Sequence, residues 1–209
     1  MSNEEEVYEI TSEQLEEIQT EAASAALAAM QQQMEIDEQR RLIKIFDEIN
    51  AEAAFMIWSA IRAYEHADPK APIYFVLSSP GGSIHSMFSI VDAMLTTTCP
   101  IVTIGTGLIM SAAVPILAAG TKGQRYLTAQ TRLLLHQQSG GQVGTQSDIR
   151  VAYEESEVLH DMHKTLIKKL TKMNKTTIKK IFEQPVDYYF GVDRALELGV
   201  ADHVFERMP

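Results

Sequence analysis

The sequence has one cysteine, no long apolar run and no basic leader, and each shortage excludes a class of protein. Cys99 is the single cysteine among 209 residues, which rules out an intramolecular disulfide framework and a cysteine-rich zinc site. No apolar run approaches the roughly 18 to 20 residues of a membrane-spanning helix. The first residues are acidic, which argues against a signal or transit peptide. We therefore expect a protein of a reducing compartment, by default the cytoplasm.

Basic residues are almost absent from the first forty positions. Residues 1–40 hold eleven acidic residues against one base, Arg40, whereas residues 41–209 hold 17 of each. The net charge of −10 therefore belongs to the head of the chain. Neither part has the basic face that nucleic-acid binding needs, so no nucleic-acid partner is expected. With 45% apolar and 22% charged residues, the chain has the composition of one soluble domain, with or without a tail.

The acidic head has the composition of a helix. Thr11-Ser12-Glu13-Gln14 is typical of a capped N-terminus, and the run to residue 40 is rich in Ala, Gln and Glu, which favour helix. Its apolar positions are mostly small, so it makes a poor core by itself. Two interpretations stay open: a partly solvated helix that frays, or an element that docks on something specific.

After residue 40 the pattern predicts alternating strands and helices. Continuous β-rich apolar runs such as 73–77 are typical of strands buried on both faces of a parallel sheet. Consecutive strands joined by helices imply crossover connections, so the fold class is α/β. We expect strands at 42–46, 73–77, 100–105 and 132–136, helices at 51–66, 84–96, 111–119 and 148–173, a further helix from about 175, and a short helix and strand within 195–202.

Three polar side chains stand beside apolar runs where packing would favour an apolar residue. Ser111 precedes an apolar helical stretch, His136 ends the run Leu133-Leu134-Leu135, and Asp187 lies among aromatic residues. Each has an ordinary structural interpretation, which for Ser111 is a helix N-cap. Together they suit nucleophilic acyl transfer, because a serine needs an imidazole to take its proton and the imidazole needs a carboxylate to orient it.

Two backbone features add to this chemistry. The predicted helix start at Ser111 leaves free N–H groups that favour an oxyanion. The turn Pro80-Gly81-Gly82 is either an ordinary strand-to-helix connection or a place where glycine lets the backbone approach a substrate. His160 and His163 lie three residues apart and could share a metal ion, but a solvated or interface face of the helix is the simpler interpretation.

The ordered segments resemble the ClpP family of self-compartmentalised, ATP-dependent serine proteases. The likeness covers about Arg41 to Phe205. The segments that carry it are Ser79-Pro80-Gly81-Gly82-Ser83, Gly107-Leu108-Ile109-Met110-Ser111 with Gly120 after it, Arg132-Leu133-Leu134-Leu135-His136-Gln137, Gly140-Gly141 to Ser147-Asp148-Ile149, Asp187, and Gly199-Val200-Ala201-Asp202. Several ordered motifs are far more specific than a single serine motif.

The resemblance implies a fold, an activity and a set of roles. The fold would be ClpP/crotonase-like, with repeated β-β-α units and a protruding handle helix. Ser111 would be the nucleophile, His136 the general base and Asp187 its orienter. The amides of Gly82 and Ala112 would form the oxyanion hole, and the substrate-binding glycines would be Gly81, Gly140 and Gly141.

The expected partners follow from the same family. They are polypeptide substrates and further copies of the chain in a heptameric ring, and the resemblance leaves open a double ring and an AAA+ unfoldase. No metal or cofactor is expected, because ATP would serve only the unfoldase. Residues 1–40 would be a gate, a docking element or a propeptide, ahead of a protease domain at 41–209.

The chain departs from the family pattern at four places. Ala112-Ala113 replace the usual Met-Gly after the nucleophile, which affects the shape of the first specificity pocket. Gln138 replaces a proline. Pro185-Val186 replace the charges that pair between rings, and the acidic head replaces a short axial loop. The last two differences lie at the features that in the family couple assembly to activity and dock a standard unfoldase.

Three alternative functions stay open beside the ring protease. One is a virus-encoded ClpP-like maturation protease, another is a non-catalytic ring subunit, and the third is a crotonase-type acyl-CoA enzyme. Inactive ring subunits generally lose triad residues, and crotonases use carboxylates. The complete set of Ser111, His136 and Asp187 therefore favours a serine endopeptidase.

Overall fold

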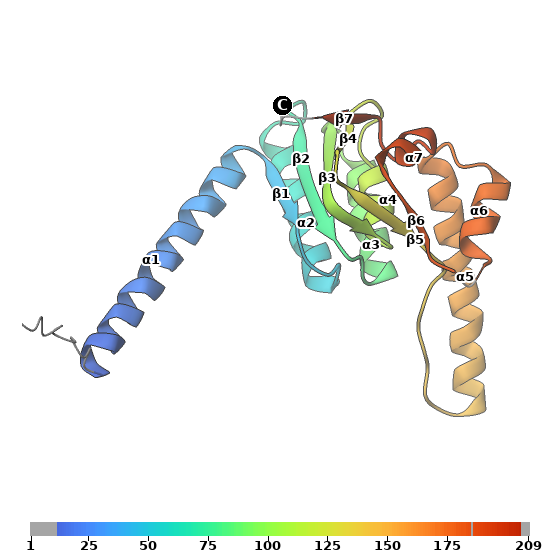
Figure 1. The fold of residues 1–209 in the computed structure, drawn as a ribbon, viewed down its shortest axis with the longest axis horizontal. Coiled ribbons are helices and arrows are strands. Elements are labelled where there is room, and N and C mark those ends of the chain that lie inside the picture. The colour runs from blue at the N-terminus through green and yellow to red at the C-terminus, as the bar shows by residue number, and fades with distance from the viewer. Residues whose placement is uncertain (1–11, 185, 206–209) are drawn as a thin grey trace, which may run out of the picture. The chain divides into compact units, whose positions relative to one another are not determined.

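The computed structural model describes residues 12–184 and 186–205, and the chain divides into two compact units, residues 1–40 and 41–209. The first unit contains the 28-residue helix α1 (Ser12–Gln39), as expected from its composition (Figure 1). Its large apolar side chains are exposed, Leu27 and Met30 among them. The helix therefore has no core of its own.

The second unit is built on a seven-stranded sheet, which confirms the α/β fold class. The strands are β1 (Leu42–Ile45), β2 (Ile73–Ser79), β3 (Ile101–Met110), β4 (Arg125–Thr128), β5 (Arg132–Leu135), β6 (Tyr188–Phe190) and β7 (His203–Phe205). The path β1-β2-β3-β4-β7 is parallel throughout. Strand β5 branches from the C-terminal end of β3 in parallel and pairs with β6 in antiparallel fashion.

The crossovers between the successive parallel strands β1, β2, β3 and β4 are the helices α2 (Ala51–Ala67), α3 (Ile84–Thr96) and α4 (Ala113–Ala118). Helices α5 (Gln146–Leu170) and α6 (Lys175–Phe182) lie between β5 and the antiparallel β6, and α7 (Val192–Glu197) lies between β6 and β7. Asn50 caps α2 by accepting a hydrogen bond from the Ala53 amide. Thr145 and Asp148 form a capping box that begins α5.

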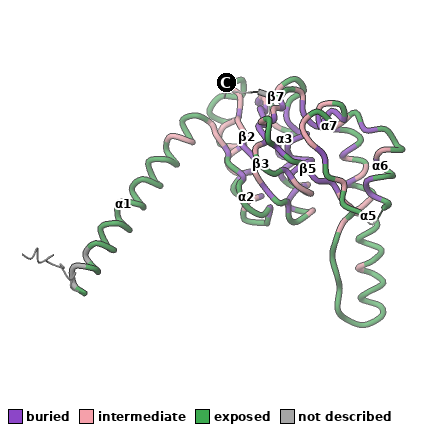
Figure 2. The backbone as a smooth tube through the Cα atoms, viewed as in Figure 1, coloured by how far each residue is buried: buried purple, intermediate pink, exposed green. Residues whose placement is uncertain are grey.

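The core lies between one face of the sheet and α2, α3 and α4. Strand β2 alternates: Phe75 and Leu77 face this core, whereas Val76 belongs to a smaller cluster with Val102 and Ile104. The tube in Figure 2 is purple through the sheet and green along the outer half of α5. Side chains of the inner half of α5, such as Ile167 and Leu170, are buried. The core therefore holds the root of α5 and leaves the rest protruding, as the resemblance implies for a handle helix.

Several sequence-based boundaries need correction. Strand β3 runs five residues past its expected end at Gly105, and α5 ends at Leu170, not Met173. The pattern missed β4 and β6 and placed the last strand within 195–202, whereas β7 is His203–Phe205, because such short strands carry little periodicity. Ser111 is not a helix cap, since α4 begins at Ala113 and its N-cap position is Ala112.

Candidate active site

Ser111 lies in a strained turn between β3 and α4. Its φ of +53° falls in the left-handed region, which a residue other than glycine occupies at a cost. The Ser111 amide donates to the carbonyl of Leu134 at 2.9 Å, and the Val114 amide donates to the Ser111 carbonyl at 3.1 Å. Both hydrogen bonds hold the turn in place. The strain is of the kind that exposes a nucleophile at a strand-to-helix elbow.

His136 reaches Ser111 because β3 and β5 are parallel neighbours. Their register pairs Met110 with Leu134, so the residues that follow both strands emerge at the same edge of the sheet. The Nε2 atom of His136 lies 2.8 Å from the Ser111 Oγ atom, within hydrogen-bonding distance. The imidazole can therefore take the hydroxyl proton, as a general base must.

The turn Pro80-Gly81-Gly82 packs closely against Ser111 and is hydrogen-bonded to Ile49. The Ile49 amide donates to the Gly81 carbonyl, and the Ser83 amide donates to the Ile49 carbonyl, both at 2.8 Å. Gly81 has a φ of +100°, and a Cβ there would lie 2.7 Å from the Ser111 Cβ atom. Any side chain at Gly81 would therefore push the turn away from Ser111.

Two amides beside Ser111 are left for a ligand. Among the described residues, neither the Gly82 nor the Ala112 amide donates to a protein group. Both residues line the same cleft as Ser111 and His136. This pair of donors has the composition of an oxyanion hole.

The cleft has a volume of about 740 Å³ and brings most of the expected site residues together. Gly140 and Gly141 line it on the exposed segment between β5 and α5, where nothing lies within 4 Å of an added Cβ at either position. Gly81 is not among the lining residues and supports Ser111 from behind. Sequence reasoning missed Tyr153 and Leu159, which α5 brings to the cleft wall.

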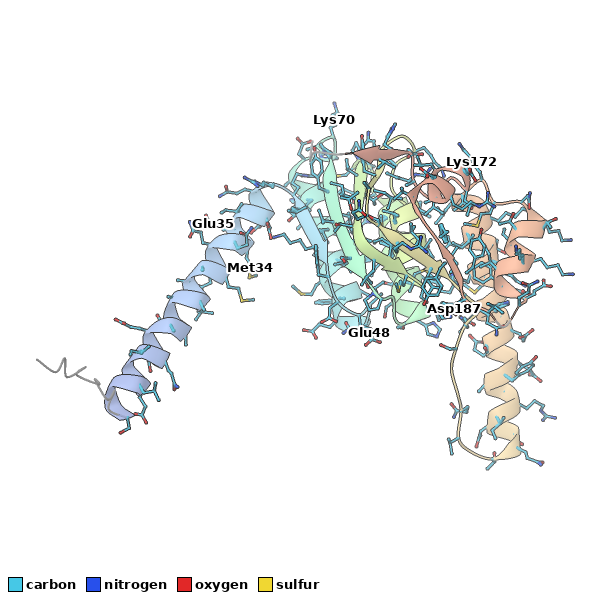
Figure 3. The ribbon with its side chains drawn as sticks, viewed as in Figure 1. Met34, Glu35, Glu48, Lys70, Lys172 and Asp187 are labelled. Carbon is cyan, nitrogen blue, oxygen red and sulfur yellow. The ribbon has the colours of Figure 1, made fainter. Side chains whose placement is uncertain are left out.

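Asp187 is exposed just before β6 (Figure 3). It is not among the residues that line the cleft. The β5–β6 ladder pairs Leu135 with Tyr188, so one further step would place Asp187 opposite His136. In the described part of the chain, no hydrogen bond joins the two side chains. The β5–β6 register thus brings the backbones of Asp187 and His136 next to each other. The Asp187 carboxylate, however, does not bond to His136, which contacts Ser111. Val186 beside it is exposed, and Pro185 lies outside the described residues.

His163 does not lie on a solvated face, contrary to the sequence interpretation. Its side chain is 5% exposed, and burial, followed by the nearby His160 and His136, lowers its pKa to about 4. Among the described residues no group of three or more potential ligands could hold a metal ion. In the same ranges, no helix is long and apolar enough to span a membrane.

Asp202, which the sequence placed in the closing strand, lies just before β7 and forms an ion pair with Arg125. Arg125 is 1% exposed and donates to both Asp202 carboxylate oxygens, at 2.6 and 2.8 Å. Burial acts to raise the pKa of Asp202, but the hydrogen bonds and charge of Arg125 outweigh it and lower that pKa. Arg125 also donates to the carbonyls of Ala118 and Leu170. It thereby joins the ends of α4 and α5 to the start of β7.

The comparisons with known proteins agree with this geometry. The Clp protease family model matches residues 24–208. The chain is 34% identical over 163 residues to ATP-dependent Clp protease proteolytic subunit 2 of Bifidobacterium longum, covering 78% of this chain and 77% of the relative. It is 35% identical over 167 residues to ATP-dependent Clp protease proteolytic subunit 1 of Leifsonia xyli, covering 79% of this chain and 83% of the relative. The corresponding subunit 1 of Prochlorococcus marinus is 33% identical over 169 residues, covering 81% of this chain and 86% of the relative. The chain therefore belongs to the Clp protease family and is a serine endopeptidase of the ClpP type.

Proposed function

We propose that Ser111 and His136 carry out this peptide hydrolysis through an acyl-enzyme. The observation that carries the assignment is the 2.8 Å contact between Ser111 Oγ and His136 Nε2 in a cleft that also contains two unused amides. A hydroxyl is a weak nucleophile unless a base removes its proton, and this contact supplies the base.

The steps follow from the positions of these groups. Ser111 Oγ attacks the peptide carbonyl while His136 Nε2 takes its proton. The carbonyl oxygen becomes negative and accepts hydrogen bonds from the Gly82 and Ala112 amides. His136 then protonates the leaving amine, the C–N bond breaks, and an ester on Ser111 remains. Water, deprotonated by His136, hydrolyses this ester and releases the second product.

We assign Asp187 to the orientation of His136 when substrate is bound. The step from Leu135 and Tyr188 along the β5–β6 register supports the assignment. The carboxylate would accept the Nδ1 proton of His136 and stabilise the imidazolium. Gly140 and Gly141 line the cleft without side chains, which supports an extended peptide lying along that segment.

We further propose that copies of the chain form a ring, heptameric as in the family resemblance, whose chamber encloses the clefts. Exposed apolar side chains on the protruding part of α5, such as Val151 and Val158, support an interface there. The named relatives are proteolytic subunits of ATP-dependent proteases, so an AAA+ unfoldase that delivers unfolded chains is the partner we propose. Cytoplasmic location stays a prediction.

The test is a Ser111→Ala variant assayed on short fluorogenic peptides. We expect turnover to fall by a factor on the order of 10⁴ to 10⁶, because the nucleophile is removed. A fluorophosphonate probe should label the wild type and not the variant. Ser59→Ala, on α2 and away from the cleft, is the matched control. Undiminished hydrolysis by Ser111→Ala would refute the mechanism, and turnover of acyl-CoA without labelling would favour a crotonase-type enzyme.

A further inference from the structure

His163 is a buried polar side chain in the active-site cleft, and the proposed mechanism does not use it. It lies on the inner half of α5, is 5% exposed, and lines the cleft together with Ser111 and His136. Neither its Nδ1 nor its Nε2 atom has a hydrogen-bond partner among the described residues. Its ring packs edge-on against Phe182, with 4.9 Å between ring centroids.

Such a side chain is costly where an apolar residue would pack without penalty. The next buried positions of α5 are Ile167 and Leu170, which need no polar partner. A buried polar group without a hydrogen bond destabilises a protein unless something else occupies its polar atoms. Because His163 lines the cleft while both its ring nitrogens are buried, a substrate side chain inserted into the cleft against this ring is the group that would supply the missing partner.

We propose that His163 lies at the base of the pocket for the substrate side chain next to the scissile bond and selects an uncharged carboxamide, glutamine or asparagine. This inference rests on the proposed function, since it assigns the specificity of the same cleft. Met87 and Leu159, which also line the cleft, provide apolar walls for the methylene groups of such a side chain. Ala112, beside Ser111, is small and leaves room for it.

The protonation state of His163 decides between polar side chains. Burial and the neighbouring His160 and His136 lower its pKa to about 4, so the ring is neutral at pH 7 and offers one N–H donor and one acceptor. A carboxamide is uncharged and can either donate to or accept from the ring nitrogen that it reaches, whichever tautomer is present. A carboxylate or an ammonium group would bring a charge without a counter-charge into this buried site, and an aliphatic side chain leaves both ring nitrogens unpaired.

The experiment compares short fluorogenic peptides that differ only in the residue before the cleaved bond: Gln, Asn, Glu, Lys or Leu. For the wild type we expect kcat/KM to be highest for Gln or Asn. In His163→Leu the ratio of kcat/KM for the better carboxamide to that for Leu should fall by 10- to 100-fold, on the order expected for an unpaired polar group. His163→Gln keeps a donor and an acceptor and should retain most of the preference.

His160→Leu is the matched control, because His160 also contacts the Phe182 ring, at 5.9 Å, but does not line the cleft. It should leave the preference unchanged. A wild type that prefers Leu, or the same preference in wild type and His163→Leu, would overturn the inference. If His163→Leu does not fold, the wild-type profile still decides. A wild type that cleaves no peptide and takes no fluorophosphonate label would contradict the proposed function instead.

Discussion

Asp187 differs from Ser111 and His136 because only the strand register connects it with the site. It follows Val186 on an exposed segment and precedes β6, whose pairing with β5 brings its backbone beside that of His136. A carboxylate that must orient an imidazole needs a hydrogen bond to Nδ1. We therefore expect this hydrogen bond to form in the working enzyme.

The prediction for Asp187→Asn is a loss of about 10⁴ in kcat, because the amide favours the wrong imidazole tautomer. Steady-state hydrolysis of a short peptide measures it. Asp193→Asn is the control, since Asp193 is an exposed carboxylate in the first turn of α7. A kcat within twofold of the wild type in Asp187→Asn would mean that another group orients His136.

The lowered pKa of His163 predicts that part of the folding stability is lost at acidic pH. Its pKa is about 4 in the folded protein, because of burial and then the charges of His160 and His136, against an ordinary value of 6.5. Between these values the unfolded chain binds more protons, so the stabilisation is complete above about pH 6.5 and is lost as the pH falls towards 4. The shift corresponds to about 3 kcal/mol of unfolding free energy.

Urea unfolding at pH 7 and at pH 4.5 measures how much unfolding free energy is lost between the two pH values. His163→Gln should lose less stability between the two pH values than the wild type does, because the titrating group is gone. His160→Gln retains His163 and should follow the wild type closely. Equal losses in wild type and His163→Gln would show that the buried imidazole does not titrate in this way.

At the scale of elements, α5 combines an anchored root with an outer half that lacks a core. The Leu170 carbonyl accepts hydrogen bonds from Arg125 and Lys122, and the Lys172 amide donates to the Leu198 carbonyl. From its outer half towards its middle, α5 exposes Val151, Val158 and Met162, whose spacings of seven and four residues place them on one face. A helix with such a face gains stability by burying it against a partner, and in the ring that we propose this partner is another copy of the chain.

We predict an oligomeric mass by light scattering at micromolar concentration, and a lower mass for the double variant Val151→Glu/Val158→Glu. Two carboxylates on the apolar face would lose solvation in the interface. Glu154→Gln changes an exposed residue of the same helix and should leave the mass unchanged. A wild-type monomer, or an unaltered mass in the double variant, would contradict the role of this face.

At the scale of the whole molecule, the first unit, residues 1–40, carries all of the net negative charge. Residues 1–40 have a net charge of −10, whereas residues 41–209 are balanced. A ring would gather several such segments, and their repulsion is screened by salt or by a basic partner. We therefore place a gate, docking element or propeptide in residues 1–40, outside the catalytic body.

Deletion of residues 1–40 should leave hydrolysis of a dipeptide-sized substrate intact and change the access of longer substrates. Ser111, His136 and Asp187 all belong to the other unit, which is the physical reason. Salt should alter the activity of the intact protein on long substrates more than that of the truncated one. Loss of both assembly and short-peptide hydrolysis on truncation would mean that the segment is structural.

Local patterns in the sequence were enough to predict most elements of the body. The helix 84–96 and the cap at Asn50 follow from apolar spacing and side-chain chemistry within a few residues. The continuous apolar run at 73–77 predicts a buried parallel strand, which β2 is. Ordered motifs likewise indicated Ser111 and His136, because each motif lies within one short segment.

Tertiary structure alone decided what depends on contacts between distant segments. The 2.8 Å contact of Ser111 with His136 joins residues 25 positions apart through the β3–β5 register. The left-handed backbone of Ser111 is held by a hydrogen bond from its amide to Leu134, a residue of a different strand, and no local pattern contains that contact. The sequence placed His163, with His160, on a solvated or interface face of a helix, whereas the packing of α5 against Phe182 of α6 and the core buries it. Burial depends on which face of a helix meets its neighbours, and helical spacing alone does not determine that face for a mixed sequence.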